Sequence, residues 1–199
     1  MRTVDHDAPH HLHQPLVPGE ERFLCLALVN TRFVLGHGPV DLLEDADAAR
    51  LWLVRHELLP DRVVLTGRQA GRLRALREAL RELCAARAEG AVPPASSLDA
   101  LNAALAAAPP TPRLVWTGRE PRRADEPDTA NPVGAALGSL AEDAADLLTG
   151  AAAGRLAPCG AQGCTRWFLR SHAARRWCTT KCGNRVRAAR HYASRKAFD

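Results

Sequence analysis

The pattern of apolar and polar positions along the chain predicts a mainly helical body. The run at 23–30 is continuously apolar. Because this run is rich in Ala and Leu rather than β-branched residues, we expect a buried helix. A second helix is expected at 45–59, where an acidic start is followed by apolar positions, and Pro60 ends it.

The stretch 71–90 has the most regular helical pattern. Four leucines recur at intervals of three, four and three residues: Leu73, Leu76, Leu80 and Leu83. This spacing places them on one stripe of a helix, which Gly90 ends. Three basic side chains share another face, which we interpret as solvated: Arg74, Arg77 and Arg81. Cys25 and Cys84 are expected to be small buried side chains.

Two further helices are expected in the body. One covers 96–108, with Ser96 or Ser97 as its N-cap. The other starts with Asn131 as N-cap and Pro132 as first helical residue, and its leucines repeat with helical spacing.

A minor β element is expected between these two helices. Residues 114–117 favour a strand and Gly118 a turn, which together predict a small hairpin. Residues 119–132 are polar and interrupted by prolines, so we interpret them as a loop. The glycine-rich stretch 150–154 ends the body. The predicted class of the body is α+β, mainly α with a minor β element.

Composition divides the chain into three segments. Residues 1–19 have no periodicity and predict a disordered arm, 20–154 form the helical domain, and 155–199 form a small module. The module has 11 Arg or Lys and a single acid, whereas the preceding residues have 16 basic and 21 acidic side chains. A basic end on an acidic body is typical of polyanion binding.

The chain has no apolar run long enough for a membrane helix and no signal peptide, so we expect a soluble, cytoplasmic protein without a membrane partner. In a reducing compartment its six cysteines are not expected to form disulfides. Four of them lie within 24 residues, which indicates metal or redox chemistry.

These four cysteines have the spacing C-x4-C, thirteen residues, then C-x3-C: Cys159, Cys164, Cys178 and Cys182. Two close pairs of thiolates can surround one tetrahedral ion, so we predict one structural Zn²⁺. An iron–sulfur cluster, a redox dithiol, or His172 in place of one cysteine are the alternatives. Neither pair is C-x-x-C, which argues against the dithiol.

The order of elements in the module predicts a small treble-clef-like zinc finger. We expect strands at 165–168 and 175–178 joined by a turn, then a helix whose first turn contains Cys182. Gly183 is expected to allow a tight backbone bend beside the metal, and Asn184 to cap exposed amides. The three aromatic side chains of the module are interpreted as its core rather than as a stacking platform for bases: Trp167, Phe168 and Trp177.

Basic side chains around the last two cysteines are the candidate nucleic-acid contacts. They are Arg175, Arg176, Arg185, Arg187, Arg190, Arg195 and Lys196. Guanidinium groups on a helix fixed by zinc would suit bidentate contacts to phosphate or guanine. A merely solvated basic helix is the alternative.

Parts of the sequence resemble two known families. The motif "C-x4-C … RRWC-x3-CGNR" resembles the CGNR zinc finger, and "LCLALVNT", "LRALREAL" and "LAEDAADLL" resemble the ABATE domain that precedes it in bacterial proteins. The resemblance implies a stress-related transcription regulator that binds DNA, in preference to RNA, through the finger. It also implies that the four cysteines are the zinc ligands and that Gly183, Asn184 and Arg185 complete the signature.

Three classes of function follow. In the leading hypothesis the finger binds nucleic acid while the body senses a small-molecule effector, forms a homodimer or recruits a protein. In the second, the finger is a protein-interaction module or a purely structural cap. An enzyme is not expected, because catalytic motifs are absent and four thiolates leave zinc no open position. Asn30 and Thr31 are candidates for a ligand pocket, with capping as the alternative.

Overall fold

The computed structural model describes residues 16–35 and 38–196. The first fifteen residues of the predicted arm therefore lie outside the described residues. Residues 16–19 of that arm belong to the folded protein, because Val17 is 1% exposed and the Pro18 carbonyl accepts a hydrogen bond from the Leu169 amide at 2.7 Å. Below, residues 20–154 are called the body and residues 155–196 the finger.

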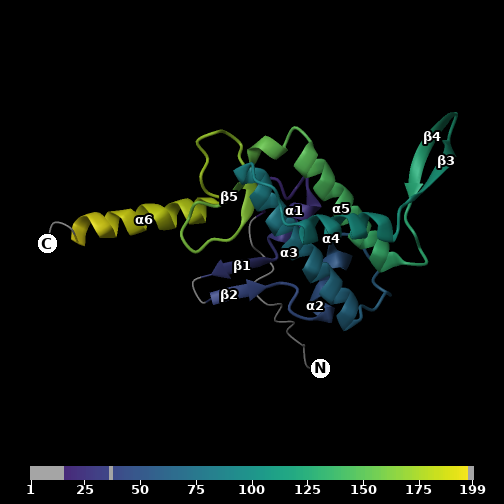
Figure 1. The fold of residues 1–199 in the computed structure, drawn as a ribbon, viewed down its shortest axis with the longest axis horizontal. Helices are drawn as coiled ribbons and strands as arrows, with labels where there is room; N and C mark the ends of the chain where they lie inside the picture. The colour runs from purple at the N-terminus through teal and green to yellow at the C-terminus, as the bar shows by residue number, and fades with distance from the viewer. Residues whose placement is uncertain (1–15, 36–37, 197–199) are drawn as a thin grey trace, which may run out of the picture.

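Helices dominate the structure, and short strands occur in pairs (Figure 1). In chain order the elements are α1 (Leu24–Val29), β1 (Arg32–Leu35), β2 (Gly38–Asp41), α2 (Ala46–Arg55), α3 (Gly67–Glu89), α4 (Ala95–Ala107), β3 (Thr111–Thr117), β4 (Glu120–Glu126), α5 (Pro132–Thr149), a 3₁₀ helix (Ala153–Arg155), β5 (Leu156–Pro158), β6 (Trp167–Leu169) and α6 (Thr180–Lys196). The α+β class is the one that the sequence predicts.

Helix α3 is the centre of the body and contacts α1, α2, α4 and α5. The four leucines of its predicted stripe are each 4% exposed or less. The helix starts four residues before the predicted start at Gly71, because Thr66 and Gln69 form a reciprocal capping box. Gly90, with a φ of 68°, ends it in the left-handed conformation that favours glycine.

The ends of the other body helices were predicted with mixed success. Helix α5 starts at Pro132, and the Asn131 side chain accepts a hydrogen bond from the Gly134 amide at 3.0 Å, as expected. The serine cap of α4 was wrong: Pro94 occupies the N-cap position. Helix α2 ends at Arg55 instead of continuing to Pro60, since Glu57 adopts a left-handed φ of 57°.

Three two-stranded antiparallel sheets occur in the described residues. The pair β1–β2 was not expected. The predicted hairpin exists as β3–β4, but its return strand consists of residues 120–126, which the sequence indicated as loop. The expected pairing of 165–168 with 175–178 was wrong, because β6 pairs with β5.

The finger packs onto the body rather than forming a separate unit. Leu156, Trp167 and Leu169, all from the β5–β6 hairpin, belong to the apolar core of the body. Beyond this contact, α6 projects away from the body at one end of the long axis, and the β3–β4 hairpin stands at the opposite end (Figure 1).

Candidate metal centre and basic helix

The four predicted cysteines meet at one point of the finger. Their sulfur atoms all lie within 4.8 Å of one another, and none of the four forms a disulfide. The Sγ atom of Cys178 lies 3.8 Å from that of Cys164 and 3.7 Å from that of Cys182. A tetrahedral Zn²⁺ with Zn–S distances of about 2.3 Å requires sulfurs about 3.8 Å apart. The donor set therefore fits one zinc ion.

The distances between the sulfur atoms also test two alternatives to four-cysteine zinc, an iron–sulfur cluster and His172 as a ligand. Sulfur atoms this close have room for a single ion between them and not for a cluster of several irons. His172 is exposed in the segment after β6 and is not part of the group. The four positions match a closed structural site, in which all coordination positions of zinc belong to protein sulfur.

Hydrogen bonds among the cysteine side chains shift their pKa values in opposite directions. The pKa of Cys159 is lowered because its sulfur accepts hydrogen bonds from the side chains of Cys164 and Cys178. The pKa of Cys164 is raised to about 11, and that of Cys178 is also raised, because both donate to Cys159. The group thus stabilises one thiolate and resists a second. A divalent cation removes this conflict, since all four sulfurs can then be ligands.

Two backbone segments hold the first cysteine pair. The loop between β5 and β6 contains Cys159 and Cys164, and the Cys159 amide donates to the Arg166 carbonyl at 2.9 Å. The Cys164 amide closes a tight turn onto the Ala161 carbonyl at 2.9 Å, helped by Gly163 with a φ of 73°. This turn brings both sulfurs to the same side.

The second pair is held by the start of α6. The Cys182 amide donates to the Thr179 hydroxyl at 3.3 Å, which positions the first turn of the helix. The Gly160 amide donates to the Arg176 carbonyl at 2.8 Å and ties the first cysteine loop to the segment before Cys178. The last ligand lies in the first turn of the helix, as predicted.

Gly183 and Asn184 have roles other than those expected. Gly183 is a buried helical residue, and a Cβ atom there would lie 3.2 Å from the Trp177 ring. Close packing, rather than a backbone bend, therefore requires glycine. The side-chain Oδ1 of Asn184 accepts a hydrogen bond from the Arg187 guanidinium and caps no amide among the described residues.

Some of the predicted nucleic-acid contacts are occupied within the finger. Arg175 donates to the carbonyls of Trp177 and Cys178 at 3.1 and 3.0 Å and so braces the segment with the third ligand. Arg185 donates to the Gln162 carbonyl at 3.1 Å. The Arg185 contact joins the two halves of the metal site, because Gln162 lies between the two cysteines of the first pair.

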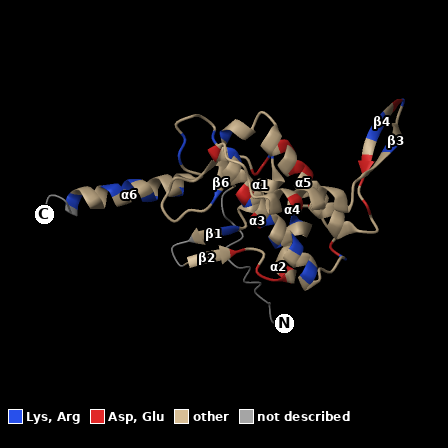
Figure 2. Ribbon diagram, viewed as in Figure 1, with Lys and Arg blue, Asp and Glu red and all other residues tan. Residues whose placement is uncertain are grey.

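The remaining arginines are exposed on the finger: Arg176, Arg187, Arg190 and Arg195. From residue 187 to 195 every side chain of α6 is exposed, and Figure 2 shows its basic residues along a helix without acidic neighbours. No ion pair involves a finger residue within the described ranges. Lys196 ends α6, and its side chain lies outside the described residues.

Asn30 joins the body to the finger. Its Nδ2 donates to the Trp167 carbonyl at 2.8 Å, and the Trp167 amide donates to its Oδ1 at 2.8 Å. The side chain is buried and also donates to Glu20 at 2.7 Å. Thr31 donates to the Leu28 carbonyl at 2.7 Å, a contact of the capping kind. A ligand pocket at these residues stays a prediction.

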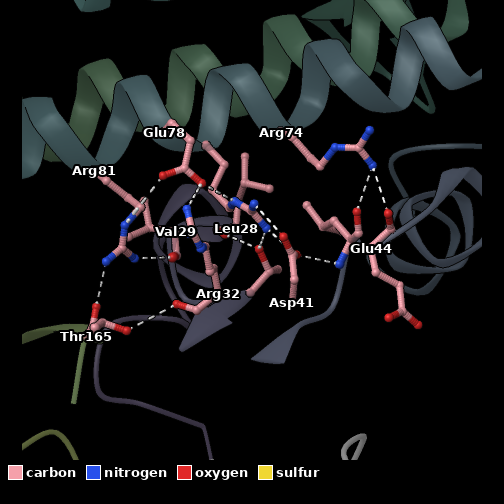
Figure 3. Close-up of polar contacts among 12 residues, drawn as sticks. Leu28, Val29, Arg32, Asp41, Glu44, Arg74, Glu78, Arg81 and Thr165 are labelled. Atoms are coloured by element: carbon pink, nitrogen blue, oxygen red, sulfur yellow. Dashed lines mark hydrogen bonds and ion pairs between the residues drawn. The ribbon is translucent and has the colours of Figure 1, made fainter. Parts of the chain in front are cut away.

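Sequence reasoning missed a second link between the two regions. Arg81 on α3 donates to the Val29 carbonyl at 2.9 Å and to the Thr165 carbonyl at 3.0 Å (Figure 3). The interpretation of its helix face as solvated was wrong for Arg77, which is 2% exposed and paired with Asp41 at 2.8 Å. Burial raises the pKa of Asp41, but the Arg77 guanidinium outweighs it and keeps that pKa below its usual value.

Comparison with known proteins identifies both parts of the chain. Residues 23–151 match the family model ABATE, described as "Putative stress-induced transcription regulator". The chain belongs to the ABATE family. Residues 155–195 match the CGNR zinc finger, so the two families occur in the order that the sequence resemblance implies. No curated protein matches the chain.

The family and the geometry agree on the metal. The CGNR finger has four cysteines positioned for one structural Zn²⁺. The ABATE and CGNR families are of the regulator and zinc-finger type rather than enzyme families. Among the described residues, no helix combines the length and apolar character needed to cross a bilayer.

Proposed function

We propose that this ABATE protein is a zinc-dependent transcription regulator whose CGNR finger binds duplex DNA through α6. The observation that supports the proposal is the exposed basic surface of a helix whose base is fixed at the metal site. The arginines of α6 beyond Val186 have no acidic partner among the described residues, so their charge is available to a polyanion.

The dimensions of α6 suit a DNA groove. The helix has 17 residues and is therefore roughly 25 Å long at 1.5 Å per residue. The major groove of B-DNA is about 12 Å wide and admits one α-helix. All side chains from 187 to 195 are exposed, so none of residues 16–35 and 38–186 covers this length of helix.

The arginines of the finger are expected to have two roles, since some hold the metal site and others contact DNA. Arg175 and Arg185 hold the metal site through backbone carbonyls, whereas the exposed guanidinium groups of Arg190 and Arg195 have no such contact among the described residues. We therefore assign DNA contacts to Arg187, Arg190 and Arg195, with Arg176 at the rim. Two of these lie near each other on α6, since Arg187 and Arg190 are three residues apart.

The body has the role of a rigid holder in this proposal. Asn30 and Arg81 fix the β5–β6 hairpin to the C-terminal end of α1 and to α3, so that α6 keeps one direction relative to the body. We further propose a cytoplasmic location and a small-molecule effector that binds the body.

Binding to labelled duplex DNA tests the proposal. Fluorescence anisotropy of zinc-loaded protein with genomic duplexes should give an affinity that falls as salt rises, with a slope of about −0.9 for each phosphate contact. The variant with Arg190→Gln and Arg195→Gln should bind at least tenfold more weakly and reduce the salt slope by roughly two. Its zinc content and thermal unfolding should not change.

A matched variant controls for net charge. Arg62→Gln with Arg68→Gln removes two positive charges from exposed sites on the body and should leave binding within about twofold. Equal loss in both double variants, or no duplex binding at low salt, would overturn the proposal. Tighter binding to RNA hairpins than to any duplex would favour the RNA hypothesis instead.

A further inference from the structure

The β3–β4 hairpin lacks a packing partner among the described residues. It stands clear of the helices at the end opposite to α6 (Figure 1), and twelve of its fourteen residues are exposed. An isolated two-stranded hairpin is at best marginally stable in water, because it has no apolar layer against which to pack. Strands of seven residues therefore need a further surface.

One face of the hairpin has two large apolar side chains from β3. Leu114 and Trp116 are 73% and 67% exposed, and they point to the same side because side chains alternate along a strand. Pro121 lies opposite Trp116 on β4, and Arg123 lies opposite Leu114. Large apolar side chains gathered on an exposed strand are typical of an interaction surface.

The two edges of the hairpin differ in what they offer to another strand. Gly118 and Arg119 form a two-residue loop, and Gly118 has the positive φ of 66° that such hairpin turns require. Thr117 and Glu120 flank this loop and are therefore a hydrogen-bonded pair. Since hydrogen bonding alternates along an antiparallel pair, the backbone groups of Leu114 and Trp116 point outward from β3.

The edge of β4 is protected, whereas most of the edge of β3 is open. By the same alternation, the outward positions of β4 are Pro121, Arg123 and Asp125. Proline has no amide to donate, and charged side chains discourage strand addition. On β3 only Pro112, at the base of the hairpin, lacks a donor. The apolar stretch from Leu114 to Trp116 is therefore free to pair.

We propose that β3 pairs in antiparallel fashion with β3 of a second copy of this chain, which gives a four-stranded sheet with the two β4 strands outside. In this register Val115 lies on the twofold axis opposite Val115 of the second copy. Leu114 of each copy then lies opposite Trp116 of the other copy. Both apolar side chains thereby gain a cross-strand partner. Such an interface is isologous.

The charges of the hairpin are compatible with pairing to a second copy. In the proposed register Arg113 faces Thr117 of the second copy, so no two like charges are opposite each other across the new ladder. The acids of the hairpin, Glu120, Asp125 and Glu126, all belong to the outer strand β4. The pairing also leaves α6 uncovered, because α6 lies at the other end of the molecule (Figure 1).

Sedimentation velocity of the zinc-loaded full chain tests the dimer. The parent protein should show a concentration-dependent shift from monomer to dimer. The variant with Leu114→Thr and Trp116→Thr should raise the dissociation constant at least tenfold, while Thr preserves the tendency to form a strand. Val64→Thr with Val92→Thr, at positions 77% and 91% exposed outside the hairpin, should leave it unchanged.

Disulfide trapping tests the register. In a non-hydrogen-bonded antiparallel pair the Cα atoms are about 4.5 Å apart, within the range of a disulfide, so zinc-loaded Val115→Cys should form a covalent dimer in oxidised glutathione. Thr117→Cys should not, because its copies would be roughly 13 Å apart. A parent that stays monomeric up to its solubility limit, or a covalent dimer through Ala124→Cys in place of Val115→Cys, overturns the proposal.

Discussion

The body and the finger differ in what holds them together. Thirty buried side chains form one continuous core of the body, and three of these come from the finger. A second cluster has seven buried residues, six of them from the finger, and three of these six are the cysteines Cys159, Cys178 and Cys182. Apolar burial is thus sufficient for the body, whereas the centre of the finger consists largely of metal ligands.

This difference has a consequence for how each region unfolds. A module of about forty residues cannot bury enough apolar surface to be stable alone. Phe168 is its only large side chain that is completely buried among the described residues, while Trp167 packs into the body. The finger should therefore depend on zinc at its far side and on the body at its near side.

Removal of zinc should have the largest effect of the changes considered. Structural zinc in small fingers contributes apparent binding free energies of about 10–16 kcal/mol at neutral pH. With a strong chelator, or in Cys178→Ser, the finger should lose its order while the helices of the body persist. Thiol titration checks this: four cysteines of the parent should become reactive with the chelator, and three in Cys178→Ser, whereas Cys25 and Cys84 should not react.

The two thiols of the body, Cys25 and Cys84, show in that experiment whether the body stays folded. Burial raises the pKa of Cys84 to about 12 and that of Cys25 further still, so neither forms a thiolate near neutral pH while the body stays folded. Reaction of all six thiols on chelation would mean that the body unfolds together with the finger, and the comparison would then fail.

A cavity in the body should have the next largest effect. Leu80 on α3 is 1% exposed at the centre of the core. Leu80→Ala should lower the free energy of unfolding by about 2–5 kcal/mol, as urea denaturation would measure. In the absence of urea, the zinc content of this variant should remain one ion per chain. The exposed Leu51→Ala, on α2, is the control and should cost less than about 0.5 kcal/mol.

The sequence predicts best what depends on local chemistry. Helix α3 follows from its leucine spacing, and the start of α5 follows from Asn131 and Pro132. The zinc ligands follow in the same way, because two close cysteine pairs leave few other arrangements. In each case the residues that specify the element are neighbours in the chain.

Features that depend on distant pairing could not be predicted in this way. Strand β6 pairs with β5 rather than with 175–178, since its register is set by burial of Trp167 and Leu169 in the body. Asn30 is separated from Trp167 by 137 positions, and its role appears only once the two regions are docked. Arg77 resembles any exposed arginine of an amphipathic helix until Asp41 is placed beside it.

Loss of the Asn30 contact should separate the two regions. Asn30→Ala leaves a buried amide and a buried carbonyl of Trp167 without their partner, at about 1–3 kcal/mol for each unsatisfied group. We expect the finger to unfold at lower urea than the body, which zinc release and far-ultraviolet circular dichroism would follow separately. The exposed Asn102→Ala on α4 should change neither transition.

The smallest expected effect is that of replacing a helical glycine by alanine, which can be compared between the body and the finger. Gly71 and Gly183 are both within helices, but no atom lies within 4 Å of a Cβ built at Gly71, whereas the Trp177 ring lies 3.2 Å from one built at Gly183. Alanine is favoured over glycine inside a helix by about 0.5–1 kcal/mol. Gly71→Ala should therefore raise the free energy of unfolding by that amount. Gly183→Ala should lose this gain and weaken zinc affinity, because Trp177 directly precedes the ligand Cys178. A gain of equal size at both positions, measured by urea denaturation and zinc titration, would show that the space beside Trp177 does not constrain the metal site.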